Sequence, residues 1–290
     1  MQIKLIGLIF SFLSLFFFSC IEKIEWESDY DIELLVVEGS FTDEYKKHEI
    51  KLTKSAKYFS DEETPAVGEA DVSITCGEET ITFIESSGEP GVYITEDPVA
   101  GTPGKEYTLD ILLENPVNEK IAYSATEKMK TGVELDSIQA ILYDNPIYSD
   151  SHADMDSLMV DIQLFWTEPF VKDNYYKVQV YLKNSVKNNT IDDIFIYRGH
   201  ENIEGESNIY FFSNFQPNEI IVLESSSVTE DYFQYIDGMK KITNQEQDQF
   251  FDFSGPPANA EGNIEGAEAL GYFRVSSVSK KFTVIRDGRE

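Results

Sequence analysis

Histidine and cysteine, which supply many catalytic and metal-binding side chains, are scarce in this chain of 290 residues. The two cysteines and three histidines include no Cys–His pair, and His48, His152 and His200 are too far apart for an H-x-x-x-H zinc motif. The sequence also lacks a G-x-S-x-G nucleophile elbow and a glycine-rich phosphate loop after a strand. Its 53 acidic residues supply so many carboxylate pairs that none of them indicates glycoside hydrolysis. We therefore expect a protein that is not an enzyme.

Basic residues are few as well. The chain has 23 lysines and arginines against 53 acidic residues, which gives a formal net charge of −30. Such a surface repels phosphate backbones and anionic lipid, so nucleic-acid binding is not expected. The 20 phenylalanines and 16 tyrosines argue against disorder despite this charge. The composition indicates a folded acidic protein whose partners are cations, or cationic or neutral ligands.

The chain begins with a short apolar block that ends at a cysteine. Lys4 precedes the block, residues 5–18, and Ser19 and Cys20 close it. A basic start, a short apolar stretch and a small residue before the cut are typical of a bacterial secretory signal. The block is shorter than the roughly 20 apolar residues that span a membrane.

The small residue directly before Cys20 resembles the lipobox of bacterial lipoproteins. The resemblance implies cleavage before Cys20 and lipid on its sulfur and new amino group, which together anchor a protein durably in a membrane. We expect a signal peptide at 1–19 and an acidic tether at 20–30, with a plain secretory signal as the alternative. The acids of the tether resemble the signal that sends Bacteroidota lipoproteins to the outer face of the outer membrane. With Cys20 lipidated, only Cys76 remains, so no intramolecular disulfide is expected.

Residues 31–128 alternate apolar and polar side chains in short runs separated by turn sequences such as SSGEPG and AGTPGK. One face of the run at 105–113 carries Tyr107, Leu109, Ile111 and Leu113. This pattern predicts an antiparallel β-sandwich with one buried face per sheet. The expected strands lie at 34–41, 48–55, 70–76, 79–86, 91–95, 105–113 and 120–127.

Residues 129–290 predict a second β domain, after the pattern pauses around 128–137. Trp166 and Tyr176, on the expected strands 157–169 and 174–184, resemble the B–C strand pair of fibronectin type III modules. One amphipathic helix is expected at 228–247, started by a capping box of Ser227 and Glu230. The fold class is therefore mainly β, with two antiparallel β-sandwich-like domains, the second carrying one amphipathic helix. Its other expected strands lie at 193–199, 208–214 and 219–226, with a closing strand from 270.

Two groups of residues are candidates for binding sites. Asp150, Asp154 and Asp156 are the best metal candidates, because carboxylate oxygens close in sequence suit Ca²⁺. Their spacing does not fit an EF-hand, and a solvated acidic loop is the favoured interpretation. The aromatic run IYFFSNF makes Tyr210, Phe212 and Phe215 candidate ligand or partner residues, since not all of its rings can point inward on one strand. Burial beneath the helix is the favoured alternative. No cofactor is expected besides the lipid on Cys20.

Four motifs occur in order after the lipobox cysteine: LLVVEGSFTDE, PGVYIT, GTPGKEYTLDI and PPANAEGNIEGAEALGYFRVSSVS. Together they resemble the Bacteroidota outer-membrane lipoprotein family described as domain-of-unknown-function family 4249. The strands GVYIT and GKEYTL also resemble a carboxypeptidase-regulatory-like, Ig-like sandwich. The family resemblance implies no catalytic residues, and it implies a place beside TonB-dependent outer-membrane receptors in nutrient uptake.

From this resemblance we expect a lipid-anchored outer-membrane protein, exposed at the cell surface. It would act as a non-catalytic accessory or substrate-capture component of a TonB-dependent uptake system. The alternative is a structural or adhesive surface lipoprotein that binds an external protein or glycan. The sequence itself names no ligand.

Overall fold

The computed structural model places Glu33–Glu290 in one compact unit. The other unit, Met1–Ile32, lies outside the described residues except for Ile32, so the predicted lipidation site Cys20 lies outside them too. The structure describes residues 32–56, 64–144, 158–167, 174–191, 193–199, 204–212, 215–247, 260–266 and 268–289.

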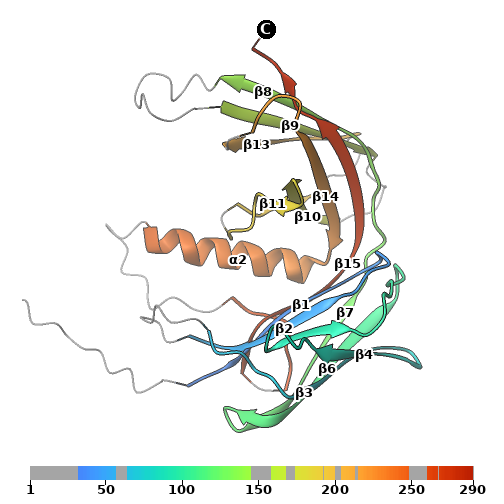
Figure 1. The fold of residues 1–290 in the computed structure, drawn as a ribbon, viewed down its shortest axis with the longest axis vertical. Helices are drawn as coiled ribbons and strands as arrows, with labels where there is room; N and C mark the ends of the chain where they lie inside the picture. The colour runs from blue at the N-terminus through green and yellow to red at the C-terminus, as the bar shows by residue number, and fades with distance from the viewer. Residues whose placement is uncertain are drawn as a thin grey trace, which may run out of the picture. The chain divides into compact units, whose positions relative to one another are not determined.

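A sheet of twelve strands runs through both halves of the chain (Figure 1). Its order is β11-β10-β14-β15-β1-β2-β5-β4-β3-β6-β7, with β12 paired to β10. The strands are β1 (Leu35–Thr42), β2 (Glu49–Lys54), β3 (Ala70–Cys76), β4 (Glu79–Glu85), β5 (Val92–Thr95), β6 (Glu106–Val117), β7 (Lys120–Lys128), β10 (Tyr175–Leu182), β11 (Ser185–Val186), β12 (Phe195–Arg198), β14 (Ile220–Val228) and β15 (Ala269–Val284).

The first hydrophobic core is built by β1 to β7 together with the first half of β15. Its side chains alternate with exposed ones along each strand, because successive residues of a strand point to opposite faces. The predicted inward face of β6 is confirmed, since Tyr107, Leu109, Ile111 and Leu113 are all buried. The chain therefore buries its apolar residues where the period-2 pattern placed them.

The long strand β15 joins the two halves of the sequence. It runs parallel to β1, pairing Leu35 with Ala269 through Thr42 with Ser276, and its second half pairs antiparallel with β14. Phe273 and Val275 of β15 belong to the same core as the N-terminal strands. The expected division into separate domains at 128/129 is therefore wrong: the last strand completes the first core, so Glu33–Glu290 is one unit.

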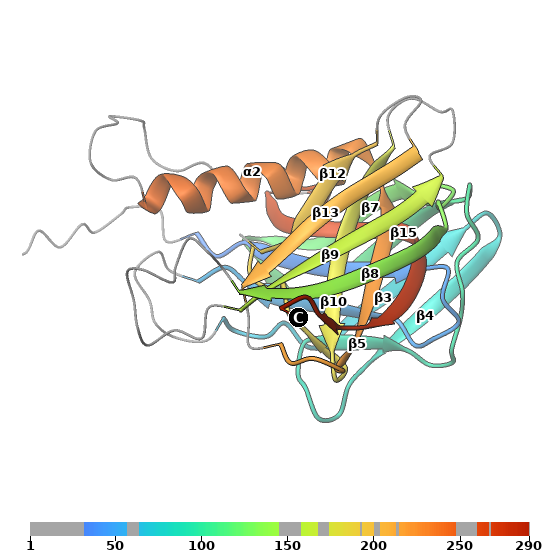
Figure 2. The ribbon, with the colours of Figure 1, turned by 90° about the horizontal axis from the view of Figure 1, so that it is seen from above.

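A smaller, four-stranded sheet has the order β13-β9-β8-β16 and encloses the second core with β10 and β14. Figure 2 shows β8, β9 and β13 side by side. The alternating residues of β9 and β10 meet in this core, including Trp166 and Val178. One strand, β8, begins at the end of the stretch 128–137 where the sequence pattern was taken to pause. The strands are β8 (Leu135–Asp144), β9 (Leu158–Thr167), β13 (Glu204–Phe212) and β16 (Arg286–Asp287).

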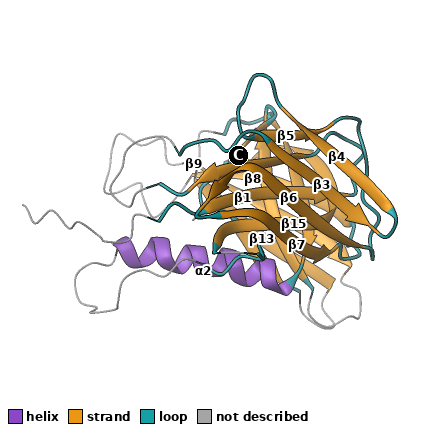
Figure 3. Cartoon of the chain, turned by 90° about the horizontal axis from the view of Figure 1, so that it is seen from below, coloured by secondary structure: helices purple, strands orange, loops and turns teal. Residues whose placement is uncertain are grey.

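Helix α2 (Glu230–Gln247) is the only helix in the described part of the chain (Figure 3). Its predicted position is confirmed, but its N-cap is Thr229, whose Oγ1 accepts a hydrogen bond from the Tyr232 backbone N–H at 3.3 Å. Ser227, the predicted cap, belongs to the end of β14. Tyr232 and Ile236 are buried against Tyr175 of β10 and Tyr272 of β15, which fixes the helix to the outer face of the large sheet.

The described structure is mainly β, with largely antiparallel sheets and one helix, which confirms the predicted fold class. Its two cores lie between layers of strands, in a sandwich-like arrangement. Among the described residues, no helix combines the length and the apolar character needed to cross a membrane.

Candidate functional site

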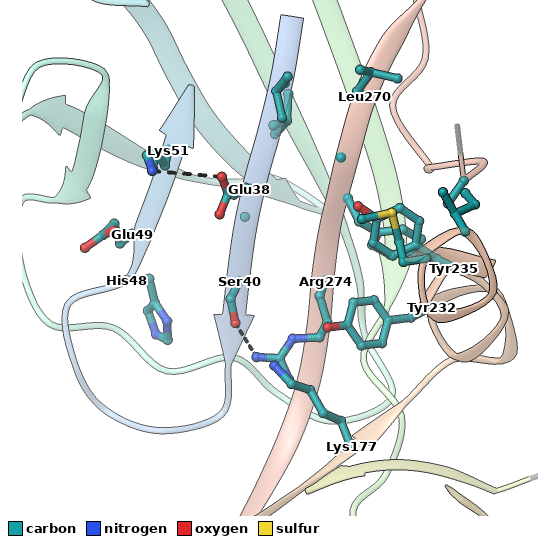
Figure 4. Close-up of a pocket in the computed structure, with 18 of the residues that line it drawn as sticks. Glu38, Ser40, His48, Glu49, Lys51, Lys177, Tyr232, Tyr235, Leu270 and Arg274 are labelled. Carbon is teal, nitrogen blue, oxygen red and sulfur yellow. Dashed lines mark hydrogen bonds and ion pairs between the residues drawn. The ribbon is translucent and has the colours of Figure 1, made fainter. Parts of the chain in front are cut away.

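A pocket of about 920 Å³ lies between α2 and the outward face of β1, β2 and β15 (Figure 4). This volume falls within the roughly 300–1,000 Å³ that small-molecule sites occupy in proteins. Strand alternation determines what enters it. Along β15, Phe273 points into the first core, while Tyr272 and Arg274 point toward the helix. In the same way, Tyr176 of β10 is buried beside Trp166 and Val178 lies in the second core, while Lys177 between them lines the pocket.

Arg274 is the most deeply placed charge of the pocket. It is only 7% exposed, and its Nη2 donates a hydrogen bond of 2.7 Å to Oγ of Ser40 on β1. Its guanidinium carbon lies 5.6 Å from the centre of the Tyr232 ring, a distance that allows a cation–π interaction. Its Nη1 is buried and has no hydrogen-bond partner in the described structure. Arg274 therefore has spare donor capacity inside the pocket.

Lys177 is the second cation, and its side chain extends toward the Arg274 guanidinium (Figure 4). Burial, and secondly the charge of Arg274, lower the pKa of Lys177 to about 7, while Glu224 acts in the opposite direction. Glu224 is itself hydrogen-bonded by Tyr181 and paired with Lys280, whose Nζ lies 3.0 Å from it. Within the described residues, neither Lys177 nor Arg274 forms an ion pair with a carboxylate. The two cations therefore repel each other without a dedicated counter-charge.

Replacing Arg274 by glutamine is expected to raise the pKa of Lys177 above about 7, because one of the two causes that lower it is removed. The check is an NMR titration of the lysine side-chain signals, with the Lys177 signal assigned by its loss in Lys177→Gln. Arg286→Gln, which removes an exposed arginine of β16, is the matched control and should leave the titration of Lys177 unchanged. An unchanged or lower pKa in Arg274→Gln would contradict the contact between the two cations.

Apolar and aromatic side chains line much of the remaining wall, and one of them, Tyr232, also lies beside Arg274. Tyr232 and Tyr235 of α2 pack against Tyr272 with ring centres 5.1 Å away in each case. The apolar stripe of α2 thus has two roles: Tyr232 and Ile236 are buried against the sheet, and Met239 and Ile242 are half-buried and line the pocket. The apolar lining consists of Val36, Leu270, Met239, Ile242 and Ala260.

The outer edge of the pocket on β1 and β2 carries charges of both signs. Glu38 and Lys51 lie 4.0 Å apart, and Lys46 is 2.6 Å from Glu44. These pairs are largely exposed, so they contribute little to stability. His48, on the same side, is buried; its Nε2 lies 3.0 Å from the Val99 carbonyl oxygen, and burial lowers its pKa. The acids of this edge are thus separate from the buried cations.

The residues predicted as sites do not gather at this pocket. Asp150, Asp154 and Asp156 lie outside the described residues, and so does Cys20. Tyr210 and Phe212 belong to β13, whose side chains are not described. Phe215 is fully buried in the second core, so its prediction as an exposed ligand residue is wrong, and it is covered by the sheets and not by the helix. Among the described residues, no cluster of three or more His, Cys, Asp or Glu could hold a metal ion.

The sequence analysis missed Arg274 and Lys177, although a weak signal was present. Both are basic residues within apolar, alternating strands, in the runs GYFRVSS and NYYKVQV. A charge at a position flanked by buried neighbours lies on the opposite face of the sheet, and that face is solvated unless another element covers it. Only the placement of α2 shows that this face is covered here.

The described residues thus form a mainly β protein with a pocket between α2 and its large sheet. The chain belongs to the family described as "Domain of unknown function (DUF4249)", whose model matches residues 21–282. This membership confirms the resemblance of the sequence motifs to domain-of-unknown-function family 4249. No protein with a curated description matches the chain significantly.

Solved structures show only remote similarity. One, titled "Cytokine receptor complex - Crystal form 2", covers 67% of this chain and 90% of its own, with 9% identity and a TM-score of 0.23. Another, titled "Biofilm associated protein - B domain", covers 86% of this chain and 85% of its own, with 6% identity and a TM-score of 0.17. Likenesses this weak carry no argument about function.

Proposed function

We propose that the protein is a non-catalytic, lipid-anchored binding protein of the outer membrane that captures a small molecule for a TonB-dependent uptake system. The observation that carries the capture role is the pocket of about 920 Å³ beneath α2, with the buried and only partly hydrogen-bonded Arg274 in its wall. A concave, mostly apolar site with a few convergent polar groups is the usual form of a small-molecule site.

The membrane anchor is supported by the sequence, through the apolar block that ends at Ser19 and Cys20. An anchor at residue 20 would leave a tether of about a dozen residues before β1, which begins at Leu35. At roughly 3.3 Å per extended residue, such a tether holds the binding domain within a few tens of ångströms of the membrane. That distance suits delivery of a ligand to a receptor in the same membrane.

The anchor is tested by comparing two cysteine variants in the native host. Cys20→Ala should abolish incorporation of labelled fatty acid and release the protein from the outer-membrane fraction. Cys76→Ala removes the other cysteine, a partly buried residue at the end of β3. This variant should keep both the fatty-acid label and its place in the outer-membrane fraction. Labelling of Cys20→Ala at the wild-type level would overturn the lipoprotein assignment.

The transport role is tested by a gentle detergent pull-down of the tagged, natively lipidated protein from its own outer membrane. Recovery of a TonB-dependent β-barrel at near one-to-one stoichiometry would support a stable accessory, with Cys20→Ala as the control for membrane context. Recovery of the lipoprotein alone would overturn the stable-accessory role.

One observation favours the second candidate, a structural or adhesive surface protein. Ile220 of β14 pairs with Val284 of β15, and both are exposed, as is the neighbouring Phe282, which is 74% exposed. Exposed apolar side chains on adjacent strands are typical of surfaces that contact another protein. Binding of an external protein in the absence of any barrel partner would move this candidate ahead.

A further inference from the structure

We propose that the pocket under α2 binds an amphipathic organic anion, with the acidic group held by Arg274 and Lys177 and the apolar body lying along the helix. This inference rests on the proposed capture role in one respect only, namely that the pocket is the ligand site. It differs from the composition-based expectation, which pointed to cationic or neutral ligands.

The local charge of the pocket favours an anionic ligand. The chain carries a formal net charge of −30, and yet two cations meet in this pocket. The carboxylate that acts on Lys177, Glu224, is engaged by Lys280, and Lys280 also pairs with Glu44 at 2.6 Å. Buried charges are costly unless they are paired and hydrogen-bonded. An anionic group from a ligand would supply the pairing that the described residues do not.

The direction of the pocket's hydrogen-bond donors also favours an anionic group. Ser40 holds Nη2 of Arg274 and the Tyr232 ring lies near the guanidinium, so the side chain is fixed from two sides. Its Nη1 is left as a buried donor without a partner. A planar guanidinium fork that is already oriented suits a carboxylate or phosphate, whose oxygens accept charge-assisted hydrogen bonds. Lys177 adds a second donor beside it (Figure 4).

The size and the lining of the pocket favour a ligand that also has an apolar body. A volume of about 920 Å³ is far larger than an inorganic ion requires. The remainder is lined by Met239 and Ile242 of the helix and by Val36 and Leu270 of the strands. Covering these apolar side chains favours binding only if the ligand itself has an apolar part, because apolar surface is then removed from water on both sides. The acids of the lining, Glu38 and Glu49, are exposed, so they lie away from the buried end where the anion would bind.

The test uses the full, lipidated chain in nanodiscs of zwitterionic lipid, with empty nanodiscs as the blank, and isothermal titration calorimetry as the readout. Three probes separate the contributions. 4-Phenylbutyrate carries an anion and an apolar body, 4-phenylbutyramide carries the same body without charge, and inorganic phosphate carries charge without the body. We expect 4-phenylbutyrate to bind about tenfold or more tightly than either 4-phenylbutyramide or phosphate. The amide cannot form the charge-assisted pair, and phosphate cannot make the apolar contact.

Three variants locate the site, and two more serve as controls. Arg274→Gln and Lys177→Gln should each weaken 4-phenylbutyrate binding by about tenfold or more, and Arg274→Lys, which keeps the charge but loses the fork, should fall between. Arg286→Gln and Lys120→Gln remove exposed charges of the same types elsewhere and should stay within about twofold of wild type. Circular dichroism melting curves check that the variants fold. Because Lys177→Gln leaves Arg274 in place and Arg274→Gln leaves Lys177 in place, unfolding of one variant still leaves the site tested by the other.

Three results would overturn the inference: no binding of 4-phenylbutyrate, equal binding of the carboxylate and its amide, or phosphate binding as tight as that of 4-phenylbutyrate. The second would mean a merely apolar pocket, and the third an inorganic anion site. The outcome is distinguishable from that of the pull-down. A protein that recovers its barrel but ignores the anion loses only this inference, and one that binds the anion without a barrel loses only the transport role.

Discussion

Replacing Gly271 by alanine is expected to lower the free energy of unfolding by roughly 3 kcal/mol or more, which combines the cost of a strained backbone with that of overpacking. Gly271 has φ of +91° and lies in β15 opposite Val37 of β1. A Cβ built there would collide with the backbone carbonyl of Val37, which cannot rotate away as a side chain could. The change would force β1 and β15 apart at the pairing that joins the two ends of the chain.

Gly104→Ala is the matched control for this prediction. Gly104 has a similar φ of +87°, but a Cβ there meets nothing within 4 Å, so alanine adds only the backbone strain of about 1–3 kcal/mol. Urea denaturation of the two variants measures the difference in their free energies of unfolding. The difference follows from the urea concentrations at the unfolding midpoints, provided that the dependence of the free energy on urea is the same in both variants. Equal losses in the two variants would show that the close approach of β1 and β15 is not what requires glycine at 271.

The local pattern predicted most of the strands and the helix because burial on one face imposes a period of two or of 3.6 residues. In β6 the predicted inward residues, Tyr107, Leu109, Ile111 and Leu113, are all buried. Strand β8 was missed, although Ile138, Ala140 and Leu142 alternate in it. Its core partners come from β9, β10 and β14, so its burial depends on strands that follow it in the chain.

The connection between the chain ends could not be predicted from local pattern. The pairing of Leu35 with Ala269 joins residues more than two hundred positions apart, and a strand period says nothing about which partner a strand takes. The expected boundary at 128/129 followed from a pause in the strand pattern, which does not show which strands are neighbours in space. The last strand instead completes the first core.

The candidate site depends on the same long-range pairing. Arg274 comes from β15, Ser40 from β1 and Lys177 from β10, and these strands come together only once the large sheet is assembled. Composition does not indicate this pocket, because net charge describes the average surface. A buried pair of cations is a local feature, and its electrostatic effect is strong at short range, where solvent screens little. The overall charge of −30 would instead slow the approach of an anion from solution, and salt would reduce that effect.

The N-terminus of α2 is attached to the sheet through one buried carboxylate, Glu127 of β7. It is 6% exposed and accepts hydrogen bonds from Thr229, from Tyr272 at 3.2 Å and from Asn263 at 3.2 Å. Asn263 also pairs with the backbone of Phe273, donating to its carbonyl at 2.8 Å and accepting from its N–H at 2.9 Å. Glu127 therefore connects β7, the start of the helix, β15 and the segment before it.

Glu127→Ala is expected to lower the free energy of unfolding by about 3 kcal/mol or more, since each buried donor left without an acceptor costs roughly 1–3 kcal/mol. Glu127→Gln keeps an acceptor oxygen and the side-chain length, so it should cost much less at acidic pH. Urea denaturation at pH 5 compares the two. A loss in Glu127→Ala no larger than in Glu127→Gln would mean that the three donors find other acceptors and that the network does not hold the helix.

The pH dependence gives an independent check on the same group. Burial raises the pKa of Glu127 above its usual 4.5, against the opposing effect of its three donors. Between 4.5 and the raised pKa, the native carboxyl retains a proton that the unfolded chain has released, so wild-type stability from this group falls as pH rises. Glu127→Gln does not titrate, and its stability relative to wild type should therefore rise through this window and then level off. A relative stability that stays constant or falls with pH would show that the donors, not burial, dominate the ionisation of Glu127.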